Sequence, residues 1–510
     1  MKILDCTLRD GGYYNNWDFS DNLVKSFLTN IAQLPIDYIE VGYRSTPQKP
    51  YFGKYFYLPD FVIQDISKIA GNKKLAIMLN EKSMKPEDAK EILPSLKPYV
   101  RLIRIAVDPE KFDRAVILAK AIKELGFEIS FNLMYMSKYH KNKDFLSKLK
   151  GVKDLLSFVY LVDSYGGMIP SDVSELVKQV KYNCSVEIGF HGHNNLELAF
   201  ANTLAAIDAG CDIVDGTILG MGRGAGNLKT ELLLTYLASN KKLHFDFNVL
   251  AKIIETWMPL YEEHQWGTNL PYMVSGAISM PQKDVMEWVT QRFYSYNSII
   301  RALKNQEAGE ADNIRLPVFK PNESFENVLI IGGGPSAEEH STVIKRFVEK
   351  CTSICIIHAS AKNAGIYKDV KVPQYFCLVG NEGHRLEEVF EDLDNFKGHS
   401  ILPPYPRKMG TYIPRGIIDK SFELKEISFT SKYKDAHTSL ALQTALNLNA
   451  NTTYVVGYDG YSHKLITPRE QALFKENDHI FTSFEMKSKI FSLLPSQYSI
   501  PQISIYTLIN

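Results

Sequence analysis

The sequence has no excess of charge of either sign and no long apolar run. Lys plus Arg and Asp plus Glu are equal at 58 each among 510 residues, so no basic field would draw the chain to nucleic acid. No stretch approaches the length of a membrane span, and the beginning of the chain has no apolar signal region. We therefore expect small-molecule partners and a cytoplasmic location.

Cysteine is scarce and is not spaced for metal binding. The six cysteines are scattered, and most lie in apolar runs. Cys351 and Cys355 are four residues apart, but one falls at a helix end and the other in an expected strand. We predict buried, reduced thiols rather than a metal site.

The length of the chain exceeds one ordinary core, so more than one domain is expected. Over residues 1–240, short β-branched or apolar runs alternate with segments of helical periodicity. Eight such runs predict a (β/α)8 TIM barrel, with a doubly wound sheet as the alternative. The predicted strands are Ile3–Leu8, Tyr38–Gly42, Leu75–Leu79, Leu102–Val107, Glu128–Leu133, Phe158–Val162, Glu187–Phe190 and Ile213–Ile218.

The rest of the chain divides into three predicted segments. Residues 241–306 show helical periodicity and many aromatic residues, which indicates a helical extension and favours a homo-oligomer. Residues 307–324 are polar and contain two prolines, as in a linker. Residues 325–510 predict a Rossmann-like α/β domain with an open sheet. Its expected strands are Asn327–Ile331, Ser353–His358, Tyr375–Val379, Lys425–Thr430 and Thr453–Gly457.

His191-Gly192-His193 follows the seventh predicted strand. Residues i and i+2 of a strand project to the same face, so both imidazoles can reach one cation. Taken alone, such a pair is more often two surface histidines on a loop. Its neighbours in the predicted barrel decide between these interpretations.

Arg9 and Asp10 stand at the end of the first predicted strand, at the same rim of a closed barrel as the two histidines. Asp10 would complete an Asp/His/His set of metal ligands. Arg9 offers a planar, permanently charged group to an oxyanion. A simple salt bridge between Arg9 and Asp10 is the alternative.

Two further features belong to the predicted rim. Glu40 lies in the second strand, and a charged residue there is expected near the end where active sites gather, so Glu40 is a candidate catalytic residue. The glycine run Gly220–Asn227 follows the eighth strand, and its backbone amides can approach an anionic substrate closely. A flexible turn is the alternative for this run.

At these positions the chain resembles the metal-dependent lyases and synthases of the DRE-TIM metallolyase superfamily, which includes 3-hydroxy-3-methylglutaryl-CoA lyase, 2-isopropylmalate synthase and 4-hydroxy-2-oxovalerate aldolase. The last of these is the nearest in pattern. The resemblance covers about residues 1–237. It rests on Thr7–Gly11, Glu40–Gly42, Asp163-Ser164 with Gly166, His191–Asn194 and Gly224–Asn227, which occur in the family order.

The resemblance implies a set of roles. Asp10, His191, His193 and Asn227 would bind a divalent metal, manganese or magnesium, with zinc and cobalt as other options. Arg9 would stabilise an enolate. The further residues that it assigns to substrate binding are Asp163, Ser164, Gly222, Gly224 and Glu231, with Glu231 also supporting the metal site.

One position departs from the aldolase pattern. Aldolases of this group carry a histidine four residues after the motif arginine, and here that residue is Tyr13. Tyrosine holds its proton at neutral pH and is a better acid than base. Tyr14, Tyr43 and His140 are other possible proton carriers that the sequence does not rank.

In the second domain, Gly332-Gly333-Gly334-Pro335-Ser336 follows a strand and suits a phosphate, although a structural turn explains it equally well. With His437 and Asp459 it resembles, distantly, 6-hydroxymethylpterin diphosphokinase-like proteins and motility-associated glycosyltransferases. The resemblance implies nucleotide or nucleotide-sugar binding. His437 would be an acid or base and Asp459 a ribose or metal contact.

Three hypotheses follow for the whole chain. The first is a metal-dependent aldolase that acts on a 2-oxo acid and an aldehyde, in sugar-acid or surface-polysaccharide metabolism. The second is a Claisen-type enzyme that uses an acyl-CoA. The third is a non-catalytic barrel fused to a nucleotide-sugar transferase-like domain, which the complete set of Arg9, Asp10, His191 and His193 argues against.

Overall fold

The computed structural model describes residues 1–510 except 242, 291–293, 313, 392, 394–395, 408, 462–466 and 510. The described residues form two compact units, Met1–Met286 and Glu287–Asn510. The boundary falls within the predicted helical extension, between two residues of one helix. Among the described residues, we find no helix that is both long enough and apolar enough to span a membrane.

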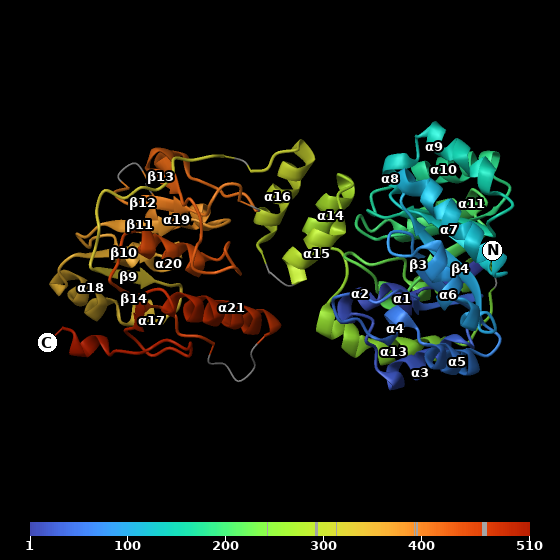
Figure 1. Cartoon of the computed structure of the whole chain (residues 1–510), viewed down its shortest axis with the longest axis horizontal. Coiled ribbons are helices and arrows are strands. Elements are labelled where there is room, and N and C mark those ends of the chain that lie inside the picture. Colours follow the sequence, from blue (N-terminus) through green and yellow to red (C-terminus); the bar gives the residue numbers. More distant parts are fainter. Residues whose placement is uncertain are drawn as a thin grey trace. The chain divides into compact units, whose positions relative to one another are not determined.

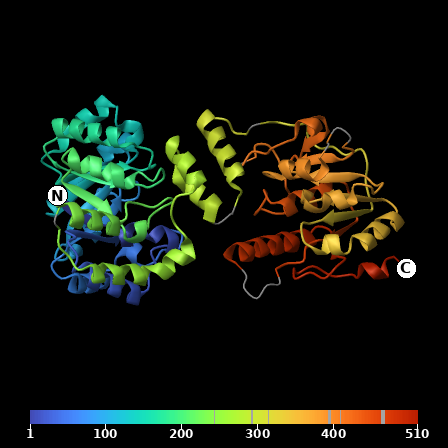
Figure 2. The same cartoon turned by 180° about the vertical axis from the view of Figure 1, so that it is seen from behind.

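The first unit is the predicted (β/α)8 barrel. In its described residues, eight parallel strands close on themselves in chain order, because β1 pairs with both β2 and β8. Figures 1 and 2 show this unit from two sides, with helices around the strands. The strands are β1 (Lys2–Asp5), β2 (Tyr38–Tyr43), β3 (Lys74–Asn80), β4 (Val100–Val107), β5 (Glu128–Leu133), β6 (Phe158–Asp163), β7 (Glu187–Gly192) and β8 (Ile213–Gly216).

The helices of the barrel unit bury an apolar stripe against the strands. α3, for example, begins at the N-cap Ser20 and buries Phe27, Leu28 and Ile31, as expected for an amphipathic surface helix. The longer helices are α3 (Asp21–Ile31), α5 (Asp60–Ala70), α6 (Pro86–Ile92), α7 (Phe112–Glu124), α10 (Pro170–Asn183), α11 (Ala199–Asp208) and α12 (Thr230–Lys241). Short helices are α1 (Thr7–Asp10), α2 (Gly12–Asn15), α4 (Lys54–Tyr57), α8 (Met136–Tyr139) and α9 (Lys143–Ser147).

Two predicted strands end earlier than expected. β1 stops at Asp5, whose carboxylate accepts the backbone N–H of Thr7 (3.0 Å) and so starts the helical turn α1. β8 stops at Gly216, and the N–H of Ile218 donates to the hydroxyl of Thr7 (2.8 Å). Arg9 and Asp10 therefore lie on a helical turn after the strand rather than on the strand itself.

The helical extension packs partly on the barrel. α13 (Phe247–His264) buries Trp257 completely, against the rings of Phe19 and Phe27. α14 (Leu270–Ala277) and the first part of α15 (Gln282–Thr290) also belong to this unit, whereas α16 (Tyr296–Ala308) belongs to the second.

The second unit is an open α/β sheet, as predicted. In its described residues, seven parallel strands follow the order β13-β12-β11-β10-β9-β14-β15. The strands are β9 (Asn327–Ile331), β10 (Ile354–His358), β11 (Gln374–Cys377), β12 (His399–Leu402), β13 (Ser421–Glu423), β14 (Thr452–Val456) and β15 (Lys489–Ser492). The helices are α16, α17 (Ser336–Glu339), α18 (Ser341–Lys350), α19 (Glu382–Phe390), α20 (His437–Asn447) and α21 (Pro468–Glu485).

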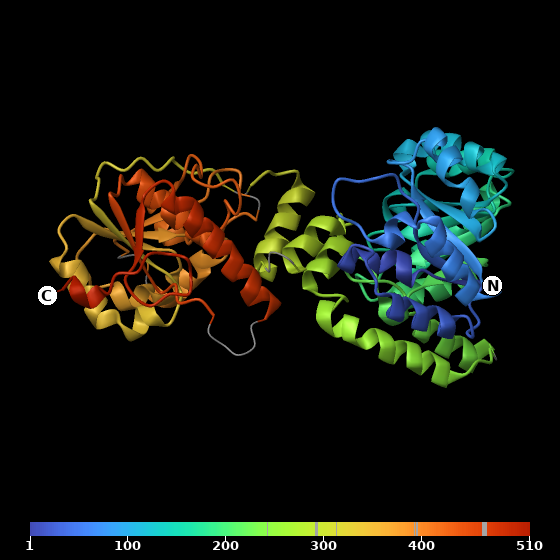
Figure 3. The same ribbon diagram turned by 60° about the horizontal axis from the view of Figure 1, so that its bottom comes forward.

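Helices cover both faces of this sheet. Alternate residues of β9 point to opposite sides: Val328 and Ile330 pack in the core that includes α20 and α21, and Leu329 and Ile331 pack in the core that includes α18. Figure 3 shows the long helix α21, in red, along one side of the sheet. This period-two alternation with both sets buried is what a parallel sheet requires.

One predicted strand of the second unit is wrong. The expected strand Lys425–Thr430 is absent from the described sheet, because the chain leaves it after Glu423 and the side chain of Gln443 accepts the N–H of Ser428 (2.8 Å). The predicted linker, residues 307–324, contacts the sheet at one point. Phe319 donates its N–H to the carbonyl of Glu423 (2.8 Å) and is buried, so Val318 and Phe319 lie along the edge strand β13.

Candidate metal centre

Asp10 is the first component of the site. α1 places its carboxylate at the carboxyl ends of the barrel strands, where it is 2% exposed. Burial alone would raise the pKa of Asp10, but the adjacent guanidinium of Arg9 and the ring of His191 hold it well below its usual range. The carboxylate is therefore ionised and able to ligate a cation.

His191 and His193 present the same nitrogen to the site. Nδ1 of His191 lies 2.9 Å from the carboxylate of Asp215, and Nδ1 of His193 lies 2.9 Å from the carbonyl oxygen of Asp163. These acceptors fix the proton on Nδ1 and leave the Nε2 lone pair of each ring available. Burial and the neighbouring His191 lower the pKa of His193 to about 3, so its ring is neutral.

These donors fit a divalent cation. One ligand atom from each of Asp10, His191 and His193 lies within 4.8 Å of the others. Nε2 of His191 is buried without a hydrogen-bond partner among the described residues, and it lies 3.5 Å from Oδ2 of Asp10. A buried nitrogen left in this state calls for a ligand.

A second geometric grouping, Cys6 with His191 and Asp215, is chemically less suitable. Burial raises the pKa of the Cys6 thiol well above its usual value, so sulfur stays protonated, and the thiolate is the form that binds metals. The carboxylate of Asp215 is also held by Arg104 at 2.5 Å.

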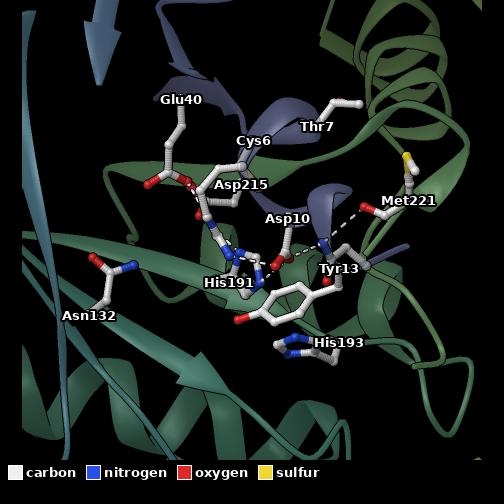
Figure 4. Close-up of polar contacts among 12 residues, drawn as sticks. Cys6, Thr7, Asp10, Tyr13, Glu40, Asn132, His191, His193, Asp215 and Met221 are labelled. Atoms are coloured by element: carbon white, nitrogen blue, oxygen red, sulfur yellow. Dashed lines mark hydrogen bonds and ion pairs between the residues drawn. The ribbon is translucent and has the colours of Figure 1, made fainter. Parts of the chain in front are cut away.

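The three ligands face a cavity of about 210 Å³ at this end of the barrel. Figure 4 shows Asp10 and His191 turned toward each other, with His193 and the ring of Tyr13 beside them. The other lining residues are Arg9, Tyr43, Met78, Asn80, Glu81, Lys82, Ala106, Asp108, Asn132, Met134, Tyr135, Val162 and Arg223. The structure thus brings Arg9, Asp10, Tyr13, His191 and His193 together, as the sequence predicts.

A buried ionic network supports the ligands from behind. Nε of Arg9 donates to Glu40 (2.8 Å), and Arg104 joins Glu40 (2.8 Å) to Asp215 (2.5 Å), which holds His191. With Asp10, the group contains two guanidinium groups and three carboxylates. The excess of one negative charge suits a cation beside the two imidazoles.

Sequence reasoning missed Arg104 and Asp215. Asp215 is the only charged residue of β8, and Arg104 is the buried one of the two arginines in the otherwise apolar β4. That pattern is itself a signal, because a charge in a barrel strand must be paired. The sequence gives no indication of the partners, which lie far along the chain.

Asn227 and Glu40 lie behind the cavity wall rather than among its lining residues. The side-chain amide of Asn227 donates to Asp10 (2.5 Å), and its Oδ1 is buried without a hydrogen-bond partner among the described residues. Asn227 thus contacts a predicted metal ligand. Glu40 holds Arg9 and does not face the cavity, in contrast to the catalytic position that the sequence suggests.

The residues predicted to bind substrate also lie outside the cavity lining. The carboxylate of Asp163 accepts the N–H groups of Gly167 (3.2 Å) and Met168 (3.1 Å), and Ser164 Oγ accepts that of Tyr135. Asp163 and Ser164 therefore hold the backbone of the loops at the rim of the barrel.

The glycine run is shaped by close packing. Gly224 has φ +68°, and a Cβ at Gly222 would approach Asn227 Nδ2 to 2.4 Å, so both positions favour glycine. Glu231 accepts the N–H of Leu219 (3.1 Å), which holds the start of this run. Arg223, between the two glycines, does line the cavity.

The candidate proton carriers differ in position. Tyr13 lines the cavity, and its hydroxyl lies 3.4 Å from that of Tyr43. Burial raises the pKa of Tyr43 well above its usual value. Tyr14 instead donates to the carbonyl of Gly224 (3.1 Å), and Nδ1 of His140 lies 2.9 Å from the carbonyl of Ser137; neither lines the cavity.

Comparison with known proteins agrees with this geometry. An HMGL-like family model matches residues 101–256. The chain is 32% identical over 259 residues to a 4-hydroxy-2-oxovalerate aldolase from Carboxydothermus hydrogenoformans, covering 50% of this chain and 75% of the relative. The chain belongs to the HMGL-like family.

Two further relatives of this HMGL-like chain are informative. It is 31% identical over 239 residues to an oxaloacetate decarboxylase from Mycobacterium tuberculosis, covering 46% of this chain and 69% of the relative. A crystal structure of the N-terminal domain of a candidate aldolase from Bacteroides vulgatus is 55% identical, with a TM-score of 0.57, over 59% of this chain and 100% of that one. Aldolases and decarboxylases both break carbon–carbon bonds, so the HMGL-like chain is a carbon–carbon lyase.

In the second unit of the HMGL-like chain, the glycine turn is not open to a phosphate. Gly334 donates its N–H to the carbonyl of Gly457 (2.9 Å), and Ser336 donates its N–H to the carboxylate of Asp459 (3.2 Å). A carboxylate thus already occupies the position where the sequence places a phosphate. Gly332 and Gly333 offer carbonyl oxygens, which accept from Asn363 and Lys362. This geometry favours the structural turn.

His437 lies elsewhere in this unit, in a cavity of about 1210 Å³ beyond the carboxyl ends of β11, β12 and β13. Its Nε2 is 3.8 Å from Glu382, which also binds Arg385 (2.5 Å). Burial lowers the pKa of His437. His437 and Asp459 therefore do not share one site, since Asp459 caps the glycine turn.

Proposed function

We propose that the chain is a divalent-metal-dependent aldolase that forms or cleaves a 4-hydroxy-2-oxo acid through a pyruvate-type enolate. The observation that carries the proposal is the Asp10, His191 and His193 group facing a cavity beside Arg9. The relatives are named for 4-hydroxy-2-oxovalerate and oxaloacetate, which are both 2-oxo acids. Cleavage of either gives the enolate of pyruvate.

Asp10, His191 and His193 would hold manganese or magnesium, and the mixed oxygen and nitrogen ligands would also accept zinc or cobalt. A bound divalent ion would act as a Lewis acid that lowers the free energy of the enolate. Asn227 would steady Asp10 from behind, through the hydrogen bond that it donates.

The cationic side chains of the cavity would share the charge of the substrate. Arg9 is held by Asp10 and Glu40, whose carboxylates raise its pKa against the opposing effect of burial, so it stays charged. It would stabilise the enolate oxygen. Arg223 also lines the cavity, and its Nε is buried without a hydrogen-bond partner among the described residues. It would bind the carboxylate of the 2-oxo acid.

Tyr13 would carry a proton to or from the hydroxyl oxygen of the substrate. It lines the cavity and pairs with the protonated Tyr43. In the condensation direction, an acid must protonate the former aldehyde oxygen when the carbon–carbon bond forms. A tyrosine suits this step better than removal of a proton from carbon.

The acyl-CoA alternative remains a second candidate, because the enolate of an acyl-CoA partner would use the same ligands. The cavity of about 210 Å³ favours a small oxo acid, since larger ligands occupy pockets of roughly 300–1,000 Å³. A requirement for CoA in the assay would separate the two. The non-catalytic barrel is disfavoured by the assembled ligand set.

The test is exchange of the pyruvate methyl protons into deuterated water, followed by NMR with added manganese or magnesium. It reports enolate formation without the aldehyde partner. We expect metal-dependent exchange in the wild-type protein and its loss in His191→Ala and after chelation. His140→Ala is the matched control, because His140 lies outside the cavity. Absence of exchange from metal-loaded protein would refute pyruvate as the substrate.

We also propose that the second unit binds a nucleotide or nucleotide sugar, in a pathway of sugar-acid or surface-polysaccharide metabolism. We place the proposed nucleotide site in the large cavity beside His437 rather than at the glycine turn, because the cavity has room for such a ligand. Calorimetric titration of wild type and His437→Ala with nucleoside di- and triphosphates would measure it. Absence of binding by the wild-type protein would refute this second proposal.

A further inference from the structure

The wall of the barrel cavity formed by the ends of β3, β4 and β5 is polar. Asn80, Glu81 and Lys82 come at the end of β3, Asp108 follows β4, and Asn132 belongs to β5. We call these five residues the polar wall. It derives from different strands than the ligands Asp10, His191 and His193.

Glu81 is the most informative residue of the polar wall. It is 2% exposed and lines the cavity. Its Oε2 accepts from Nε of Arg114, while Oε1 is buried without a hydrogen-bond partner among the described residues. A buried carboxylate oxygen without a donor is unfavourable, and a ligand that supplies a donor removes the penalty.

The charges of the polar wall are balanced. Glu81 pairs with Arg114, and Nζ of Lys82 lies 3.9 Å from the carboxylate of Asp108. With Arg114 included, the two carboxylates and the two cationic groups cancel, so the wall has no net positive charge to attract an anionic partner. It offers acceptors through Glu81 and Asp108 and donors through Lys82.

Asn132 adds a donor to this set. Its Oδ1 accepts from Ser130 Oγ (2.8 Å) and from Nε of Arg104 (3.4 Å). These hydrogen bonds use the side-chain oxygen of Asn132. The side-chain N–H groups are therefore the part of Asn132 that can donate to a ligand. A hydroxyl group both donates and accepts, so it matches a wall of mixed donors and acceptors.

We propose that the polar wall selects an uncharged hydroxyaldehyde as the carbonyl partner of the enolate, with Glu81 Oε1 accepting a hydroxyl hydrogen of the aldehyde. This inference rests on the proposed aldolase function and names its partner class. In the condensation, the pyruvate methyl group loses a proton to a base and bonds to the aldehyde carbon. The aldehyde oxygen gains a proton, which gives a 4-hydroxy-2-oxo acid with a further hydroxyl group.

The experiment compares aldehydes that differ by one hydroxyl group. Glycolaldehyde is paired with acetaldehyde, and glyceraldehyde with propanal; glyoxylate serves as the anionic aldehyde. We expect kcat/KM for each hydroxyaldehyde to exceed that of its partner by about ten- to a hundredfold, the range for a hydrogen bond to a charged group. Glyoxylate should be a poor substrate.

Variants at Glu81 separate recognition from intrinsic aldehyde reactivity. In Glu81→Leu, the ratio of the two kcat/KM values should fall by about tenfold or more, because the acceptor is lost. The exposed Glu87→Gln should keep the wild-type ratio. A ratio cancels any general loss of activity. If Glu81→Leu does not fold, Glu81→Gln, which keeps one weaker acceptor, should lower the ratio by at least about threefold.

The outcomes distinguish the two proposals. Three results would overturn the hydroxyaldehyde inference: an unchanged kcat/KM ratio in the Glu81 variants, no preference for hydroxyaldehydes in the wild-type protein, or a preference for glyoxylate. If the wild-type protein still exchanges pyruvate protons, the aldolase proposal stands in each of these cases. Absence of pyruvate exchange in the wild-type protein overturns both.

Discussion

Arg104 donates to Glu40 across 2.8 Å while both side chains are completely buried within the barrel. The same guanidinium binds Asp215 and lies 4.2 Å from the ring of Tyr160. Arg104 therefore connects the residue that holds Arg9 to the residue that holds His191. The positions of the Arg9 and His191 side chains in the cavity therefore depend on Arg104, which does not line the cavity.

Arg104→Met should destabilise the first unit by about 3–5 kcal/mol, because it leaves two buried carboxylates without their shared cation. Urea unfolding followed by tryptophan fluorescence would measure the change. Arg101→Met is the matched control on the same strand: Arg101 is 59% exposed and should change stability by less than about 0.5 kcal/mol. Equal effects of the two substitutions would contradict the buried network.

Tyr13→Phe should lower kcat for the aldol reaction by about a hundredfold while manganese binding, followed by electron paramagnetic resonance, is retained. The phenol would be the proton carrier, and losing such a group removes about this factor. Tyr51→Phe, at an exposed tyrosine, is the control. A loss of less than about threefold would mean that another group, such as Tyr43, carries the proton.

The parts of the barrel that repeat were predictable from the sequence. β-branched runs at regular spacing gave the strands, and the i, i+2 relation placed His191 and His193 on one face. The ends of β1 and β8 were not predictable, because side chains of Asp5 and Thr7 bond across neighbouring segments there. Such hydrogen bonds between segments produce no periodic pattern in the sequence.

Contacts between distant residues limit sequence reasoning in the same way. Arg104 and Asp215 are separated by 111 positions, so neither identifies the other. In the second unit, β12, β13 and β15 have three or four residues each, too few to show an alternating pattern. The phosphate prediction at Gly332–Ser336 failed to anticipate Asp459, which reaches the turn from another strand end.

Asp459→Ala should increase the hydrogen exchange rate of the Ser336 amide by about fivefold or more, because the carboxylate that accepts this N–H is lost and a cap of this kind contributes about 1 kcal/mol. Mass spectrometry of peptides covering 332–340 would measure it. Asp419→Ala, at an exposed aspartate, should leave that peptide unchanged. If exchange stays at the wild-type rate while nucleotide binding is lost, Asp459 is a ligand contact instead.

Asp5 should make the first unit less stable as pH rises from about 4 to 6. Burial raises the pKa of Asp5 to about 6, although Thr7 and Thr230 donate hydrogen bonds to it. The folded chain therefore keeps a proton that the unfolded chain releases near pH 4, and it binds more protons across this window. The stability from this proton is present below about pH 4 and is lost as pH rises through about 6, a change of about 3 kcal/mol.

Asp5→Asn isolates this effect, because asparagine does not titrate. The measured quantity is the free energy of unfolding of the wild type minus that of Asp5→Asn. A hydrogen bond lost in the variant changes this difference by the same amount at every pH. The difference should therefore decrease between pH 4 and 6 and be level above pH 7. Urea unfolding at each pH gives this difference. Asp113→Asn, at an exposed aspartate, should give a difference that does not vary over the same range. A difference that increases with pH would mean that the hydrogen bonds from Thr7 and Thr230 outweigh burial and lower the pKa of Asp5.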